Sequence, residues 1–140
     1  MGIQKDKLTE DQKKEIERLR QFVSRNRLNA HMNSTKWRAA IDAIQAIPGY
    51  RAAFRVKRIT DANEPPANVW DTAFPGNIPL YNSIEWLELN PHAEPIAVPG
   101  ARPKRMDFSE ALKRELDAAH IPVMESGTGI RIVAHTRQAK

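Results

Sequence analysis

The segment SIEWLEL, residues 83–89, decides how the rest of the chain is interpreted. Its apolar and polar residues alternate, as side chains do on the two faces of a β-strand. The alternation predicts two opposed sets of side chains: Ile84, Trp86 and Glu88 on one face, and Glu85, Leu87 and Leu89 on the other. The segment therefore predicts a strand, and its two glutamates, three residues apart, are expected not to converge.

The charge around this strand is unusual for the chain as a whole. The 140 residues carry a formal net charge of +5, yet no Lys or Arg occurs between Ile59 and Arg102. The same window holds six acids and four large aromatic residues: Asp61, Glu64, Asp71, Glu85, Glu88 and Glu94, with Trp70, Phe74, Tyr81 and Trp86. Acidic side chains are rarely buried, so these acids are expected at the surface.

Helices and further strands are predicted on both sides of the window. A helix capped by Thr9 and a second capped by Asn33 or Ser34 precede a strand over residues 50–59, in which Phe54 and Val56 alternate with basic residues. Residues 59–81 are predicted to form a long loop with one short strand near Val69, and residues 91–103 a second, proline-rich loop. A third helix is predicted to begin at an Asp107–Glu110 capping box, and a hairpin to turn at residues 126–128.

This order predicts an α+β fold, with a mainly antiparallel sheet of about four strands, helices packed on one face, and an N-terminal amphipathic helix in front. We expect residues 32–140 to form a single domain and residues 1–31 a helical leader. His31-Met32 is a common cloning scar, which leaves open whether that leader is native. The apolar face of the first helix favours a native segment.

No catalytic group is predicted. The chain has no cysteine, and its four histidines lie far apart without a partner at ligand spacing, so neither a metal site nor a cofactor is expected. The sequence SGTG at residues 126–129 lacks the lysine of a phosphate-binding loop and reads as a turn. Nothing resembles a membrane span or a secretory signal, which favours the cytoplasm.

Two binding functions remain. The acidic, aromatic window over residues 61–98 is typical of a surface that attracts and anchors a basic protein partner. The predicted partner-binding residues are Trp70, Asp71, Phe74, Tyr81, Glu85 and Glu88. The alternative is nucleic-acid binding through the basic residues Arg51, Arg55, Lys57 and Arg58, although no nucleic-acid-binding motif accompanies them. The sequence does not indicate an oligomeric state.

Two segments resemble a family of small uncharacterised bacterial proteins. MNSTKWRAAIDAI, residues 32–44, resembles that family's Asn-Thr-Lys-Trp-Arg opening, and VWDTAFPGNIPLYNSIEWLEL, residues 69–89, resembles its Trp-Asp element and Ile-Glu-Trp-Leu-Glu strand. The resemblance implies a native helical leader and carries no known activity. By analogy with other small bacterial α+β domains, the most specific expectation is an immunity protein that neutralises a toxin.

Overall fold

A four-stranded antiparallel sheet with the order β2-β3-β7-β6 forms the centre of the protein. The computed structural model describes residues 8–93 and 106–137, and its main sheet consists of β2 (Phe54–Arg58), β3 (Ile84–Leu89), β6 (Val123–Glu125) and β7 (Ile130–Val133). β3 lies inside this sheet between β2 and β7, and β6 and β7 form the predicted hairpin. The predicted α+β fold is confirmed.

The helices begin close to where their capping residues predict. α1 (Glu10–Arg25) starts behind a complete Thr9–Gln12 capping box, and α2 (Ser34–Gln45) starts behind Asn33, whose side chain accepts a hydrogen bond from the Lys36 amide. α3 (Ser109–Ala118) differs from the prediction, because its N-cap is Phe108 and no side chain caps it. Asp107 instead accepts hydrogen bonds from the amide and hydroxyl of Ser109. The predicted Asp107–Glu110 capping box is therefore wrong.

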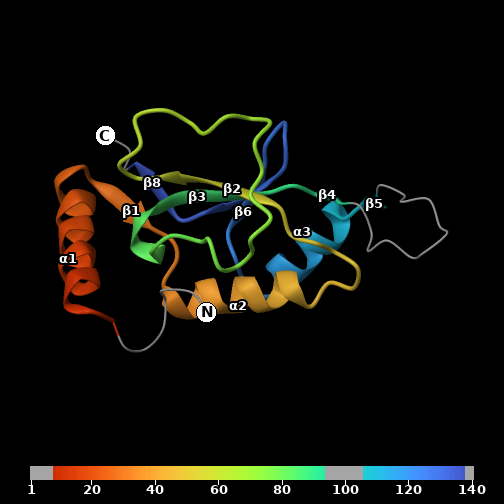
Figure 1. Ribbon diagram of the computed structural model, residues 1–140, viewed down its shortest axis with the longest axis horizontal. Coiled ribbons are helices and arrows are strands. Elements are labelled where there is room, and N and C mark those ends of the chain that lie inside the picture. Colours follow the sequence, from red (N-terminus) through yellow and green to blue (C-terminus); the bar gives the residue numbers. More distant parts are fainter. Residues whose placement is uncertain (1–7, 94–105, 138–140) are drawn as a thin grey trace.

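α2 and α3 pack against one face of the sheet, which we call the inner face (Figure 1). Trp37 and Ile44 of α2 and Leu112 and Leu116 of α3 are buried there. They meet the strand residues that alternate toward the helices, among them Phe54, Leu87, Leu89 and Ile132. Burial of this apolar surface supplies most of the stabilisation of the fold.

Three further pieces of structure connect distant parts of the chain. β1 (Leu28–Ala30) pairs with β8 (His135–Arg137), so the segment after α1 is joined to the other end of the chain. β4 (His92–Ala93) pairs with β5 (Met106–Asp107), and the short 3₁₀ helix η1 (Tyr81–Ser83) leads into β3. These strands are two or three residues long, which is too short for a hydrophobic period to be recognised in the sequence.

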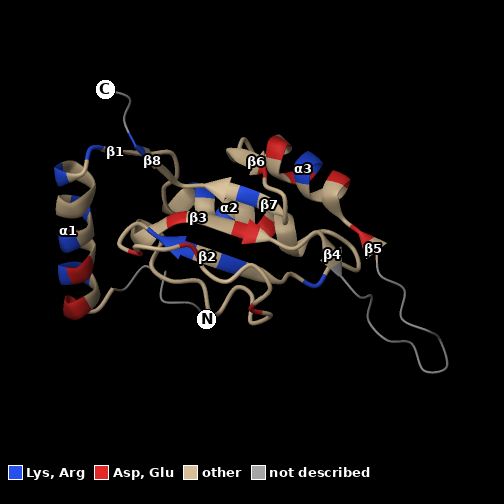
Figure 2. Ribbon diagram, turned by 90° about the horizontal axis from the view of Figure 1, so that it is seen from above, with Lys and Arg blue, Asp and Glu red and all other residues tan. Residues whose placement is uncertain are grey.

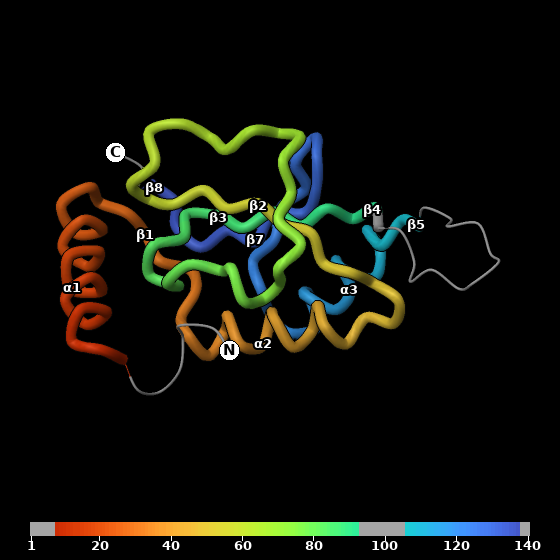
Figure 3. The backbone as a smooth tube through the Cα atoms, in the orientation of Figure 1, coloured from red at the N-terminus to blue at the C-terminus, as the bar shows by residue number. Residues whose placement is uncertain are grey.

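Residues 59–80 connect β2 to η1 and cross the second face of the sheet, which we call the outer face. Their first half runs above the sheet, and their second half descends past the β2 edge toward the helices (Figure 3). Asp71 exchanges both backbone hydrogen bonds with Phe54, so this segment covers the β2 edge at that point. The short strand predicted near Val69 is thus reduced to a single bridge.

Some predictions fall on residues 94–105, which lie outside the described part of the chain. They include Glu94, the last residues of the predicted acidic surface and most of the second proline-rich loop. No helix within residues 8–93 and 106–137 combines the length and the apolar character needed to cross a membrane.

Candidate functional site

A row of side chains crosses the outer face of the sheet, aligned by the strand register. Arg55 of β2 pairs with Glu88 of β3, Glu88 pairs with Arg131 of β7, and Arg131 pairs with Met124 of β6. Directly opposed residues in a sheet point to the same face, so these four side chains are neighbours. The register therefore places one carboxylate between two guanidinium groups.

Glu88 is fully buried and its two carboxylate oxygens accept four hydrogen bonds. Oε1 accepts from Arg131 Nε at 2.6 Å and from Ser126 Oγ at 2.8 Å. Oε2 accepts from Arg55 Nε at 3.0 Å and from Thr128 Oγ1 at 2.6 Å. The expectation of an exposed acid is wrong at this position, because both the charge and the lone pairs of Glu88 are satisfied inside the protein.

The electrostatics of Glu88 follow from these contacts. Burial acts to raise the pKa of the carboxyl group, but the hydrogen bonds from Arg55, Thr128, Arg131 and Ser126 together outweigh burial and lower the pKa to about 2. The side chain is therefore an anion at neutral pH. It acts as the fixed counter-charge of two arginines and is poorly suited to proton transfer at that pH.

The two arginines lie against tryptophan rings and bind the segment that crosses the outer face. The Arg131 guanidinium lies 3.9 Å from the centroid of the Trp86 ring, and Arg55 lies 5.3 Å from Trp86 and 5.6 Å from Trp70. Arg55 also donates to the carbonyl oxygen of Pro65 at 2.9 Å, and Arg131 pairs with Glu64 at 3.6 Å. These contacts fix residues 64–70 above the sheet.

Charges that are segregated along the sequence are paired in space. Basic bands on β2 lie beside acidic bands on β3 (Figure 2). Besides the Glu88 cluster, Lys57 binds Glu85 at 2.9 Å, and Glu64 lies 3.6 Å from Arg131. The window without Lys or Arg thus supplies the acids that neutralise the basic strands, and less of its charge faces solvent than its composition indicates.

The six predicted partner-binding residues are distributed between surface and interior. Trp70, Asp71, Phe74 and Glu85 are half-buried, whereas Tyr81 and Glu88 are buried. Tyr81 stacks on Trp37 with ring centroids 5.6 Å apart, and Phe74 packs edge-on against Phe54. Asp71 orders its own loop by accepting hydrogen bonds from the Ala73 amide and the Asn77 side chain.

Glu85 and Glu88 have different surroundings, and so do the four basic residues of the nucleic-acid alternative. Glu85 and Glu88 share no hydrogen-bond partner, since Glu85 binds Lys57 and Glu88 binds Arg55 and Arg131. The predicted alternation of this strand is wrong at Ile84, which is buried in the core with Leu87 and Leu89, because the register of β2 and β3 shifts between Lys57 and Arg58. Of the four basic residues proposed for nucleic-acid binding, Arg55 and Lys57 are engaged in internal ion pairs, and Arg51 and Arg58 are exposed. In the described ranges, His, Asp and Glu side chains form no group of three that could hold a metal ion.

Comparison with known proteins places the chain in a family. A family model described as a family of unknown function, DUF6678, matches residues 19–139. The chain belongs to this family. The DUF6678 match includes every strand of the sheet and all members of the Glu88 cluster. No curated protein and no solved structure matches the chain.

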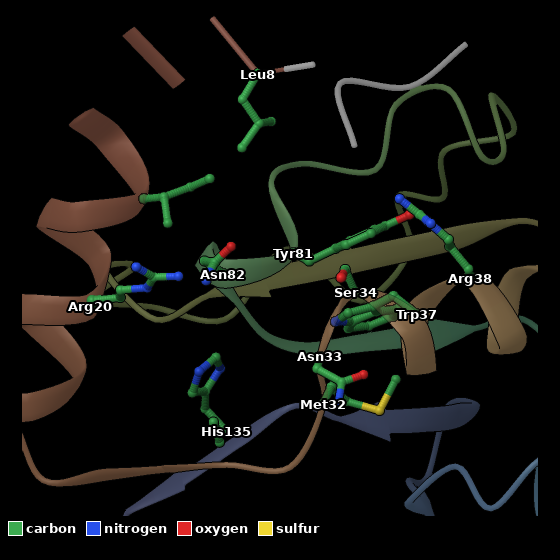
Figure 4. A pocket seen from close by; sticks show the side chains of 12 residues that line it. Leu8, Arg20, Met32, Asn33, Ser34, Trp37, Arg38, Tyr81, Asn82 and His135 are labelled. Atoms are coloured by element: carbon green, nitrogen blue, oxygen red, sulfur yellow. The ribbon is translucent and has the colours of Figure 1, made fainter. Parts of the chain in front are cut away.

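Two arrangements in this DUF6678 member were not predicted from its sequence. Arg131, Ser126 and Thr128 were not expected around Glu88, because only the register of three strands brings them together. The second arrangement is a cleft between α1 and the rest of the protein, lined among others by Arg20, Trp37 and His135 (Figure 4). Its residues come from the first third, the middle and the last part of the chain, so their spacing in the sequence does not predict the cleft.

Proposed function

We propose that this protein is a non-catalytic, cytoplasmic binding domain that recognises a protein partner through residues 61–74 on the outer face. The observation that supports this proposal most strongly is the fixed conformation of that segment. Contacts to Arg55, Arg131 and Phe54 hold it against the sheet at three separate points. A loop that is ordered before binding loses little conformational entropy when it meets a partner.

The chemistry of the segment's surface is suited to a partner with basic and apolar groups. Val69 is 63% exposed beside the half-buried Trp70, and Asp61 and Glu64 are exposed in the same segment. In this proposal Trp70, Asp71, Phe74 and Glu85 contribute to the contact surface, and Val69 joins them. Glu88 supports that surface from the interior through Arg55 and Arg131, whereas Tyr81 stacks on Trp37 in the core and does not take part. Aromatic anchors with a few charged neighbours are typical of the energetic centre of an interface.

The most specific version of the proposal is a bacterial immunity protein that occludes the active site of a toxin. A nuclease toxin has a basic cleft, and an acidic segment with apolar anchors could close it. Asp61 and Glu64 are both exposed and are the acids best placed for this contact, and Glu64 also pairs with Arg131. The alternative, nucleic-acid binding, would have to rely on Arg51 and Arg58.

The test is affinity capture from a nuclease-treated lysate of the native host with two matched variants. Val69→Lys and Met106→Lys each place a lysine at an exposed apolar position, but only Val69 belongs to the proposed surface. We expect one stoichiometric protein partner with the wild-type chain and Met106→Lys, and at least about tenfold less with Val69→Lys, since interface anchors commonly contribute over about 1.4 kcal/mol.

The outcomes separate the hypotheses. A partner that inhibits bacterial growth when expressed alone, and is harmless when co-expressed with this chain, would support toxin neutralisation. A partner that does not inhibit growth would support protein binding in general and would exclude toxin neutralisation. Equal capture by both variants would contradict the proposed surface. Recovery of nucleic acid from an untreated lysate, with no protein partner after treatment, would favour the alternative.

A further inference from the structure

A cleft of about 450 Å³ lies between α1 and the body of the protein. Its walls include Ile16 and Arg20 from α1, Ser34 and Arg38 from α2, Asn82 from η1 and His135 from β8. The volume lies within the range of small-molecule sites, roughly 300–1,000 Å³. The cleft and the outer-face surface are lined by different residues, so a ligand of the cleft is independent of the protein partner proposed for that surface.

The polar lining of this cleft favours an anion. Among the described residues, the lining includes two arginines and no Asp or Glu. The first turn of α2 opens onto the cleft through Asn33 and Ser34 and contains no acidic residue. Backbone N–H groups at a helix N-terminus carry partial positive charge and bind oxyanions when neighbouring side chains allow it.

His135 provides an independent indication of a ligand. The residue is only 8% exposed, and its Nδ1 lies 2.6 Å from the carbonyl oxygen of Ile84. Because a carbonyl oxygen only accepts, Nδ1 carries a proton and donates it. The ring projects into the cleft (Figure 4), and within the described residues Nε2 has no hydrogen-bond partner. Nε2 itself is solvent-accessible, because no described side-chain nitrogen or oxygen is both buried and without a partner, so this nitrogen is available to a molecule bound in the cleft.

An apolar wall faces these polar groups. Trp37 and Tyr81 form a stacked pair beside the cleft, and Ile16 and Met32 add aliphatic surface. Arg20 is held only loosely, since its nearest acidic partner, Glu17, lies 3.9 Å away in an exposed pair. Such a pair contributes little to stability, so Arg20 can turn to a ligand at small cost.

We propose that the cleft binds a small organic anion through a phosphate-type oxyanion seated at the N-terminus of α2, between Arg20 and His135. The amides of Ser34 and Thr35 and the guanidinium of Arg20 donate hydrogen bonds to the oxyanion, while the Lys36 amide stays bound to the Asn33 side chain. His135 Nε2 accepts from a phosphate hydroxyl or, when protonated, donates to an oxyanion oxygen. The apolar wall receives the organic part of the ligand.

The experiment uses inorganic phosphate as the probe and follows backbone amides by NMR at constant ionic strength. We expect saturable shifts at Ser34 to Trp37 and at the His135 ring. Arg20→Gln should weaken phosphate binding about tenfold, the value expected for one lost hydrogen bond to a charged group. Arg18→Gln is the matched control, because Arg18 lies on the same helix in an equivalent exposed pair with Glu15 but does not line the cleft.

A second variant introduces repulsion without changing shape. Asn82→Asp adds a carboxylate to a lining whose described residues have none, and we expect phosphate binding to disappear while the amide spectrum keeps its folded dispersion. The proposal is overturned if phosphate gives no saturable shift at the α2 N-terminus. It is equally overturned if Arg18→Gln weakens binding as much as Arg20→Gln, since that result indicates unspecific attraction to a basic surface.

Discussion

At the scale of single residues, Glu88 shows how a charge can be fully buried at a position that alternates with core leucines. Desolvation of a carboxylate costs several kcal/mol, and only close counter-charges and hydrogen bonds offset it. Arg55 and Arg131 supply the charge, and Ser126 and Thr128 occupy the remaining lone pairs. The two arginines depend on Glu88 in turn, because they lie on the same face with little exposure.

We therefore expect Glu88→Gln to destabilise the protein by about 3 kcal/mol at pH 7, because two buried guanidinium groups lose their shared counter-charge. The measurement is urea unfolding followed by tryptophan fluorescence. Glu64→Gln is the control, since Glu64 is exposed and lies 3.6 Å from Arg131, and its loss should cost less than about 1 kcal/mol.

The stability lost in Glu88→Gln should also depend on pH. The pKa of Glu88 falls from 4.5 to about 2 on folding, so its ionisation stabilises the folded state fully above about pH 5 and progressively less as the pH falls toward 2. The difference in unfolding free energy between wild type and Glu88→Gln should narrow over that interval. A difference that stays constant from pH 5 to pH 2 would contradict the assignment of the ionised carboxylate.

At the scale of elements, the β6–β7 hairpin depends on one glycine for its approach to β3. A Cβ atom at Gly129 would collide with the carbonyl oxygen of Leu89 and lie 3.0 Å from Cγ of Glu88. At Gly127, two residues earlier, a Cβ would meet nothing within 4 Å. Gly129 permits close packing of the hairpin against β3, whereas Gly127 lies at an open turn.

Gly129→Ala should therefore cost about 2 kcal/mol, because the hairpin must move away from Leu89 and Glu88. Gly127→Ala should change the free energy of unfolding by less than about 0.5 kcal/mol. Thermal unfolding of the two variants under one set of conditions distinguishes them. Equal costs would show that the turn, and not the contact with β3, restricts both positions.

Sequence patterns predicted the long helices and strands, but they did not predict features that depend on how the strands pair. Thr9 and Asn33 predicted the starts of α1 and α2, because a cap acts within four residues of its own helix. The capping box at Asp107 was wrong because the helix starts two residues later. Glu88 was expected at the surface because its partners depend on strand register, which a single strand does not encode.

At the scale of the whole molecule, the segment that follows α1 and the last described strand lie side by side. α1 stands beside the sheet, and β1, which follows it, pairs with β8 (Figure 1). The division into a leader over residues 1–31 and a domain over residues 32–140 therefore crosses a strand pair. The α1 side chain buried most deeply is Leu19, which is 4% exposed.

Leu19 is not a member of the main hydrophobic cluster, so α1 packs as a separate layer. We expect Leu19→Ala to cost about 2 kcal/mol locally and to lower hydrogen-exchange protection of the α1 amides by at least about tenfold, while amides of β3 and β7 keep theirs. Leu112→Ala, which removes a fully buried side chain between α3 and the sheet, is the control and should lower protection throughout. If Leu19→Ala also reduces protection in β3 and β7, α1 and the sheet unfold as one unit, and the cleft between them is as rigid as the core.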